Sequence, residues 1–131
     1  MMKHTILILF LFLSLLCHGQ SYKFFTTDRE LSSSLINKIY QDRNGMIWIA
    51  TEDGLNRYDG AKFITYKHDP ENEYSLCHNY VRVLYEDSKG RLFVGTYNGI
   101  QLYDPETDSF SARAQWEDGK TFDSNIMSIL E

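Results

Sequence analysis

Short apolar runs separated by turn residues make up most of the chain after residue 35. Residues 47–50 are apolar throughout and follow Asn44-Gly45, a pair typical of tight turns. Because side chains alternate along a strand, Trp48 and Ala50 share one face and the two isoleucines of the run share the other. Both faces are apolar, which predicts a strand that is buried on both sides within a stack of sheets.

The same pattern returns 45 residues later, and residues 31–59 align with residues 76–104 without a gap. Leu35, Ile36 and Ile39 sit at helical spacing, but Val81 and Val83 alternate in the second copy, so both segments are predicted as strands. A third copy begins near residue 126. Its members Ile126, Ile129, Leu130 and Glu131 follow Val81, Leu84, Tyr85 and Glu86 at the same spacing, and the identical pairs of the first two copies are Leu31/Leu76, Tyr40/Tyr85, Asp42/Asp87, Gly45/Gly90, Thr51/Thr96, Gly54/Gly99, Tyr58/Tyr103 and Asp59/Asp104.

A repeat of this length is typical of arrays in which each unit stacks on the next, and the strand and turn signals favour a β-propeller over a helical array. We predict an all-β propeller fragment with about two four-stranded antiparallel blades and the start of a third, after an N-terminal signal-peptide helix. The fourth strand of each blade is predicted at 62–67 and 110–114. The expected organisation is a lead-in strand at 20–30, blade repeats at 31–75 and 76–120, and the start of a third repeat at 121–131.

The first nineteen residues are typical of a secretory signal peptide, with a positively charged start and an apolar run at residues 6–16. That run is too short for a membrane-spanning helix, which needs about 20 apolar residues. We expect a signal peptide over 1–19 that is cleaved between Gly19 and Gln20. An uncleaved N-terminal anchor and acylation of Cys17 are the alternatives.

Charge and cysteine content narrow the function. The net charge is −5, and it becomes −6 once Lys3 leaves with the signal peptide, so the chain has no basic field that would attract nucleic acid. Only Cys77 remains after cleavage, which excludes an internal disulfide framework. The fold must therefore rest on packing.

The repeated aspartates are better explained as turn supports than as catalytic groups, because each precedes a turn where its side chain can accept backbone N–H bonds. Catalytic residues have no mechanistic reason to recur in successive blades. We therefore predict a structural repeat motif and no catalytic residues. The motif comprises Asp42, Gly45, Trp48, Thr51, Gly54, Tyr58 and Asp59 in the first copy, and Asp87, Gly90, Phe93, Thr96, Gly99, Tyr103 and Asp104 in the second.

The sequence contains no motif for metal binding, nucleophilic catalysis or phosphate binding. The aspartate-glycine turns lack the further oxygen ligands at the spacing that calcium needs, so no metal site is predicted. His68 and His78 have no recognisable partner, and the sequence has neither a nucleophile elbow nor a phosphate-binding loop. We expect no cofactor.

Three aromatic residues at positions that do not repeat are the candidates for ligand contact. Tyr74, Tyr97 and Trp116 lie in or beside predicted loops, where flat rings can stack on sugar faces and neighbouring Asp and Asn side chains can bind hydroxyl groups. The alternative is that these rings cover blade edges, since single exposed aromatic residues are common.

The units IYQDRNGMIWIATEDGLNRYDG and LYEDSKGRLFVGTYNGIQLYDPETDSF resemble the two-component regulator propeller repeats of periplasmic sensor regions in Bacteroides hybrid two-component systems. The family pattern is an aspartate, a glycine turn, a Leu-Trp-Ile-Gly-Thr-like strand, a Gly-Leu turn and a Tyr-Asp end. The resemblance covers residues 31–131. It departs from the pattern at Ala50 and Phe93, which we interpret as packing changes.

The resemblance implies a full-length protein with two seven-bladed propellers, a β-sandwich domain, one membrane crossing, a histidine kinase and a response regulator that binds DNA. It implies that such a sensor detects oligosaccharides and controls polysaccharide-utilisation genes. This chain would be its exported, non-catalytic N-terminal segment on the periplasmic side of the inner membrane. Its partners would be the remainder of its own protein, an oligosaccharide and, at full length, a second copy.

A second hypothesis is a fragment of a secreted propeller enzyme or lectin that acts on polysaccharide and is built from the same kind of blade. Under either hypothesis, an open stack of blades exposes an apolar face and is expected to associate.

Overall fold

The structure is a computed structural model that describes residues 22–26, 30–111 and 128–129. The predicted signal peptide with its cleavage site at Gly19 and Gln20, the candidate Trp116 and most of the predicted third repeat lie outside these residues. The described residues form strands and no helix. The strands are β1 (Ile36–Gln41), β2 (Ile47–Thr51), β3 (Gly54–Tyr58), β4 (Phe63–Tyr66), β5 (Val81–Glu86), β6 (Leu92–Thr96), β7 (Gly99–Asp104) and β8 (Ser109–Phe110).

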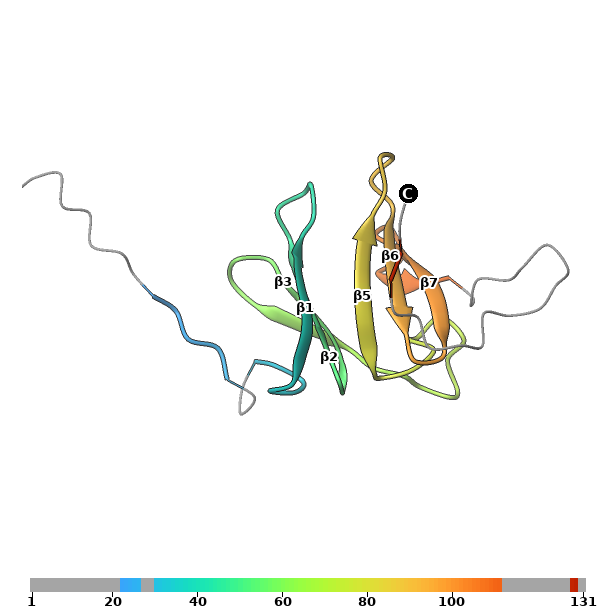
Figure 1. Cartoon of the computed structure of the whole chain (residues 1–131), viewed down its shortest axis with the longest axis horizontal. Coiled ribbons are helices and arrows are strands. Elements are labelled where there is room, and N and C mark those ends of the chain that lie inside the picture. Colours follow the sequence, from blue (N-terminus) through green and yellow to red (C-terminus); the bar gives the residue numbers. More distant parts are fainter. Residues whose placement is uncertain (1–21, 27–29, 112–127, 130–131) are drawn as a thin grey trace, which may run out of the picture.

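These strands form two antiparallel sheets of four, in the orders β1-β2-β3-β4 and β5-β6-β7-β8 (Figure 1). Each sheet is a meander, because every strand pairs with the next strand along the chain. Thr51 pairs with Gly54, and Thr96 with Gly99, so two-residue turns close the central hairpin of each sheet. Two successive four-stranded meanders confirm the predicted all-β propeller fold, and we call them the first and the second blade.

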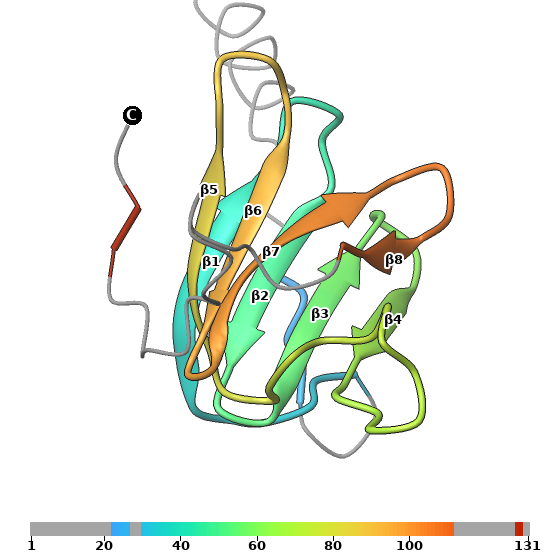
Figure 2. The same cartoon turned by 90° about the vertical axis from the view of Figure 1, so that its right-hand side faces the viewer.

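The two blades lie face to face and are closest at their first strands. β5 packs against β1 and β2, and Figure 2 shows β1 and β5 side by side, with β4 and β8 at the opposite edge. We call the β1 and β5 side the inner edge. Sheets that meet at their first strands and separate toward their fourth are arranged as neighbouring blades around a propeller axis.

A bulge interrupts the first strand of each blade. The register shifts between Ile36 and Lys38 in β1, and between Val81 and Val83 in β5. An extra residue moves the following side chains to the other face, which explains why the apolar residues of β1 do not follow a simple alternation. The helical spacing seen in the sequence of the first copy therefore belongs to a bulged strand.

The core fills the space between the blades. Trp48 and Ala50 of β2 point toward the second blade and belong to one hydrophobic cluster with Val94 and Tyr103. All four side chains are buried. The rings of Trp48 and Tyr103 meet edge to face with centroids 4.7 Å apart. On the other face of β2, Ile49 is only 6% exposed and Ile47 is half-buried. β2 is thus covered on both faces.

Phe25 lies on the face of the first blade that points away from the second. The predicted lead-in strand is not found in the described part of 20–30, since residues 22–26 and Glu30 form no strand. Instead, the Phe25 ring packs against Tyr58 and Phe63, with centroids 5.0 and 4.9 Å apart. The fourth strand of the first blade is shorter than predicted, because β4 spans Phe63–Tyr66. In the second blade β8 spans Ser109–Phe110, and residues 112–114 of the predicted strand lie outside the described residues.

A polar cluster closes the contact between the blades. The Arg57 guanidinium contacts the rings of Trp48, Tyr66 and Tyr103 at 5.6 to 5.7 Å and pairs with the Asp108 carboxylate at 2.8 Å. The hydroxyls of Tyr66 and Tyr103 donate to the same Asp108 oxygen at 2.6 and 2.7 Å. Burial, together with the bond to Asp108, raises the pKa of Tyr103 to about 12. We call Arg57, Tyr66, Tyr103 and Asp108 the clasp.

Candidate ligand-binding surface

The first aspartate of each copy holds the turn between the first two strands of its blade. Asp42 Oδ1 accepts the backbone N–H groups two and four residues later, at 2.9 and 3.0 Å. Asp87 Oδ1 accepts the equivalent pair at 3.0 and 2.9 Å. The backbone N–H of Arg91 is the main reason that the pKa of Asp87 lies below its ordinary value. Both carboxylates are therefore engaged within their own turns.

The second oxygen of each aspartate has a different donor in each copy. In the first, the Trp48 indole Nε1–H donates to Asp42 Oδ2 at 2.8 Å. Phe93 replaces that tryptophan and has no donor, but Arg91 Nε–H donates to Asp87 Oδ2 at 2.6 Å and its guanidinium lies over the Phe93 ring at 5.4 Å. Phe93 therefore changes the hydrogen bonding as well as the packing.

The remaining repeated residues also have roles inside each blade. Asp59 Oδ1 accepts the N–H groups of Ala61 and Lys62, and Asp104 accepts bonds from the turn that follows it. The backbone N–H of Lys62 holds the pKa of Asp59 below its ordinary range, and the Thr107 hydroxyl does the same for Asp104. Thr51 Oγ1 donates to the carbonyl of Gly54 at 2.8 Å, and Thr96 repeats this bond with Gly99 at 3.1 Å.

Side chains at positions that differ between the copies gather at one end of the blades. This end carries the β2–β3 and β6–β7 turns and the connector before β5, and it lies at the bottom of Figure 1. We call the group His78, Tyr80, Arg82, Tyr97 and Glu52 the turn-end surface. Tyr97 and Glu52 occupy equivalent positions of the two copies.

Three aromatic rings form the centre of the turn-end surface. The rings of His78 and Tyr97 have centroids 5.5 Å apart, and those of Tyr80 and Tyr97 are 6.3 Å apart. The Tyr97 backbone N–H donates to the carbonyl of Tyr80 at 3.0 Å, which ties the turn to the connector. Tyr97 is 55% exposed. A ring held by its backbone and open to solvent is suited to stacking against a ligand.

Polar groups surround these rings. The Tyr80 hydroxyl donates to Glu52 Oε1 at 3.0 Å, and the Arg82 guanidinium lies over the Tyr80 ring at 5.2 Å. His78 Nδ1 accepts the Tyr80 backbone N–H at 2.9 Å, so the neutral imidazole carries its proton on Nε2 as a hydrogen-bond donor. Flat rings beside a carboxylate acceptor and several donors are suited to a small ligand that has both apolar and polar groups.

The sequence singled out Tyr97 in this group and did not identify Tyr80, Arg82 and Glu52 as candidates. A signal for them exists, because all three occupy positions that differ between the copies and lie next to turns. The counterparts of Tyr80 and Arg82 in the first copy are Leu35 and Asn37. The counterpart of Glu52 in the second copy is Tyr97. The sequence could not predict that the connector before β5 contacts the β2–β3 and β6–β7 turns.

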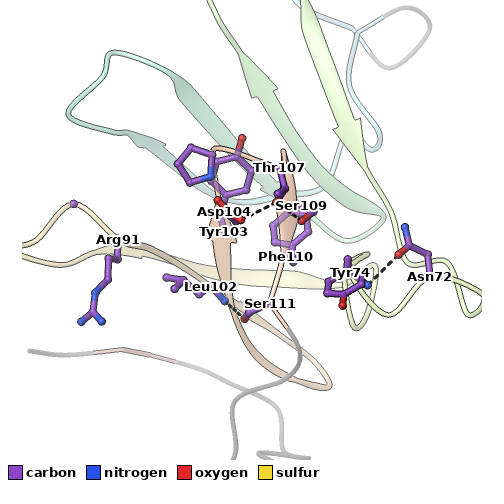
Figure 3. Close-up of a pocket in the computed structure, with 12 residues that line it drawn as sticks. Asn72, Tyr74, Arg91, Leu102, Tyr103, Asp104, Thr107, Ser109, Phe110 and Ser111 are labelled. Atoms are coloured by element: carbon purple, nitrogen blue, oxygen red, sulfur yellow. Dashed lines mark hydrogen bonds between the residues drawn. The ribbon is translucent and has the colours of Figure 1, made fainter.

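Tyr74 lies elsewhere. Its carbonyl accepts the backbone N–H of Phe110 at 2.9 Å, and its side chain, also 55% exposed, borders a hollow of about 900 Å³ (Figure 3). Leu102 and Ser111 line this hollow, and they face each other across β7 and β8 as Arg57 and Ile64 do in the first blade. Arg57, the counterpart of Leu102, contacts the neighbouring blade, so the hollow lies on a blade-packing face rather than in a built ligand site.

Within residues 22–26, 30–111 and 128–129, no group of three or more histidine, cysteine, aspartate or glutamate side chains could hold a metal ion. None of these residues belongs to a helix long and apolar enough to cross a membrane. The candidate Trp116 is outside this part of the chain.

Residues 30–53 and 75–98 match the family model of the two-component regulator propeller. Two segments of the chain are similar to the repeat of this family. Each match spans the first two strands of a blade and the turn that follows them. The second matched segment contains His78, Tyr80 and Tyr97, so most of the turn-end surface lies within the segments that match this family model.

The two propeller repeats are also similar to larger proteins. Over 73 residues, 53% of this chain and 5% of the relative, the sequence is 40% identical to histidine kinase P4 of Formosa agariphila. The solved extracellular domain assigned to the hybrid two component system BT3049 of B. thetaiotaomicron is 33% identical, with a TM-score of 0.66 over 79% of this chain and 15% of that one.

A second solved structure, the extracellular domain assigned to the hybrid two component system BT4673 of B. thetaiotaomicron, is 25% identical, with a TM-score of 0.62 over 82% of this chain and 15% of that one. The chain thus spans about 15% of the solved domains and 5% of the kinase. The similar proteins are extracellular domains and a histidine kinase, and the fold of the two propeller repeats is that of such sensor domains.

Proposed function

We propose that this chain is a non-catalytic part of the exported sensor region of a hybrid two-component system, on the periplasmic side of the inner membrane. The observation that carries the proposal is the 33% identity and TM-score of 0.66 with an extracellular domain of that kind. The 40% identity with a histidine kinase supports the same assignment. In the full-length protein a histidine kinase would transmit the signal, and no catalytic step would occur in the blades.

The ligand in this proposal is an oligosaccharide that contacts the turn-end surface, and the response is transcription of polysaccharide-utilisation genes. Tyr97 supplies an exposed ring, and the Glu52 carboxylate next to Tyr80 supplies an acceptor for sugar hydroxyls. His78 Nε2 adds a donor. A directional acceptor and a directional donor beside a platform give orientation as well as affinity.

The turn-end surface connects both blades, which gives a route from binding to signalling. The connector residue Asn79 accepts the Gly54 backbone N–H at 2.7 Å through its carbonyl, and its amide donates to Asp53 at 3.2 Å, both in the first blade. The adjoining Tyr80 is tied to Tyr97 in the second blade. A ligand held by these groups favours one relative position of the blades, and differential affinity for that position is what a sensor needs.

Isothermal titration calorimetry with a panel of purified oligosaccharides tests the proposal, using the wild-type chain and two tyrosine variants. Tyr97→Ala removes the platform, and we expect at least one oligosaccharide to lose about tenfold in affinity. Tyr74→Ala is the matched control, because this tyrosine is equally exposed but lies on the blade-packing face. Equal losses in both variants, or no binding by the wild-type chain, would contradict the proposal.

The same oligosaccharides added to cells that carry a transcription reporter test the signalling part. We expect induction by the sugar that binds, and loss of induction with Tyr97→Ala. Release of new reducing ends by the purified chain would instead support the secreted propeller enzyme, and binding without any transcriptional response would support a lectin.

A further inference from the structure

A second hollow lies at the inner edge, where β1 and β5 run side by side (Figure 2). Its volume is about 490 Å³, a size that holds a small ligand or one or two sugar rings. Lys38 and Tyr40 of β1 line it from one side, and Arg82 and Glu86 of β5 line it from the other. The hollow therefore takes charged side chains from both blades.

The positive charges in this hollow are not balanced. Glu86 is already engaged, because its Oε1 pairs with Arg43 Nε at 2.7 Å and its Oε2 accepts the Tyr40 hydroxyl at 3.0 Å. Lys38 and Arg82 form no salt bridge with any residue that the structure describes. Two unpaired cations thus line one hollow in a chain whose net charge is −5.

Arg82 is placed here by the β5 bulge. Its first-blade counterpart, Asn37, also sits in a bulge and uses its amide to donate to the carbonyl of Val81 at 2.8 Å. Arg82 instead lies over the Tyr80 ring at 5.2 Å, and Tyr80 is a neighbour of Tyr97. The basic hollow and the aromatic turn-end surface therefore meet at Arg82, and one extended ligand can contact both.

We propose that the ligand of this surface is an acidic saccharide, with its carboxylate or sulfate group bound by Arg82 and Lys38 and a sugar ring against Tyr80 and Tyr97. The inference rests on the proposed function and names its ligand class. A guanidinium offers a planar pair of donors that matches the oxygens of a carboxylate or sulfate, and a neighbouring ammonium adds a point charge. Neutral saccharides use the rings but gain nothing from the cations.

The test is calorimetric titration of the full chain with three probes: trigalacturonate, a sulfated galactose trisaccharide and neutral galactotriose, with inorganic sulfate as a fourth titrant. The double variant Lys38→Gln/Arg82→Gln removes the two unpaired charges. Lys62→Gln/Lys89→Gln is the matched control, because it removes the same charge from two exposed turns outside the hollow. Circular dichroism and a melting curve show that each variant is folded.

We expect at least one acidic trisaccharide to bind about tenfold more tightly than galactotriose. Lys38→Gln/Arg82→Gln should abolish that preference, and Lys62→Gln/Lys89→Gln should keep it. The carboxylate and sulfate probes show which acidic group is preferred. Equal loss in both double variants means that general charge causes the preference, and it overturns the inference.

Two further outcomes separate the inference from the proposed function. Equal binding of neutral and acidic trisaccharides, with loss in Tyr97→Ala, overturns the acidic ligand and leaves the sensor proposal standing. Binding of inorganic sulfate that depends on Lys38 and Arg82, without binding of any trisaccharide, overturns the acidic saccharide, whereas the sensor proposal fails only if no oligosaccharide of the panel binds. That outcome leaves a simple anion site.

Discussion

At the scale of the residue, the two repeats allow the hydrogen bonds of the same aspartate to be compared in two sequence contexts. Asp42 receives its second bond from Trp48, and Asp87 receives it from Arg91. The carboxylate is kept and the donor changes, so the bond itself is what the turn requires. A carboxylate oxygen in a covered turn needs a donor, because leaving it without one is costly.

Replacing Arg91 tests this exchange of donors. Arg91→Met removes the bond to Asp87, and we expect the melting temperature to fall by a few degrees. Adding Phe93→Trp recreates the arrangement of the first blade, and it should recover most of that loss. Phe93→Trp alone is the control. If the double variant melts no higher than Arg91→Met, the interpretation that Arg91 replaces the tryptophan donor is wrong.

The glycines of the two turn types differ in how much they constrain substitution. Gly54 has φ of +131°, and a Cβ there would lie 2.8 Å from the carbonyl oxygen of Tyr66, whereas Gly45 has φ of +84° and open space around it. We expect Gly54→Ala to cost about 2 kcal/mol more in the free energy of unfolding than Gly45→Ala. Urea unfolding followed by Trp48 fluorescence measures both. Similar costs would show that the positive φ angle sets the cost of the substitution and that the close contact with Tyr66 adds nothing.

Most of the structural motif could be predicted from the sequence, because turn residues and alternating apolar residues act locally. Trp48 lies in the core and Asp42 binds its own turn. The clasp could not be predicted in this way. Arg57, Tyr66 and Asp108 have no equivalent partners in the other copy, and they meet only because the blades stack.

At the scale of the element, the clasp makes the contact between the blades sensitive to acid. Burial alone would raise the pKa of Asp108, but the bonds from Tyr66 and Tyr103 and the charge of Arg57 hold it below its ordinary value. Its contribution to stability is therefore present above about pH 4 and is lost as the pH falls through that lowered pKa.

Asp108→Asn tests the acid sensitivity. We expect the variant to be less stable than wild type at neutral pH and the difference to shrink in acid, because protonated Asp108 and asparagine are both uncharged. Urea midpoints measured across the acid range give the comparison, and Glu106→Gln is the control on the same exposed turn. A difference that stays constant with pH would contradict a role for the Asp108 charge.

The bulges show where reasoning about elements from sequence fails. The second copy alternates apolar and polar residues clearly enough to predict a strand, but the apolar residues of the first copy sit at helical spacing. Both are strands with a register shift at the same place. A single extra residue cannot be seen in a pattern of six, although in β5 it places Arg82 at the hollow.

At the scale of the whole molecule, the period of 45 residues predicted the architecture because each blade repeats one set of local rules. The candidate ligand-binding surface followed from the opposite criterion, which is where the copies differ. That criterion selected both Tyr97 and Tyr74, but in the structure Tyr97 lies in the turn-end surface and Tyr74 borders the hollow on a blade-packing face. Sequence differences identify candidates, but only the stacking of blades separates these two roles.

The first strand leaves an apolar surface that predicts self-association. Leu35, Ile36 and Ile39 are 57%, 44% and 59% exposed at the inner edge, a larger apolar group than single exposed residues make. We expect the full chain to form dimers or larger species as its concentration rises, because burying these side chains releases water from apolar surface. Sedimentation velocity over a range of concentrations measures this.

Ile36→Lys/Ile39→Lys should keep the chain monomeric, since two charges cannot be buried without partners. Thr65→Lys is the matched control, because it adds a charge to an exposed position of β4 at the far edge of the same blade. Association that persists in the double variant and stops in Thr65→Lys would place the contact at the outer edge. A second copy would then be excluded from β1, and the inner edge with its basic hollow would stay open to a ligand.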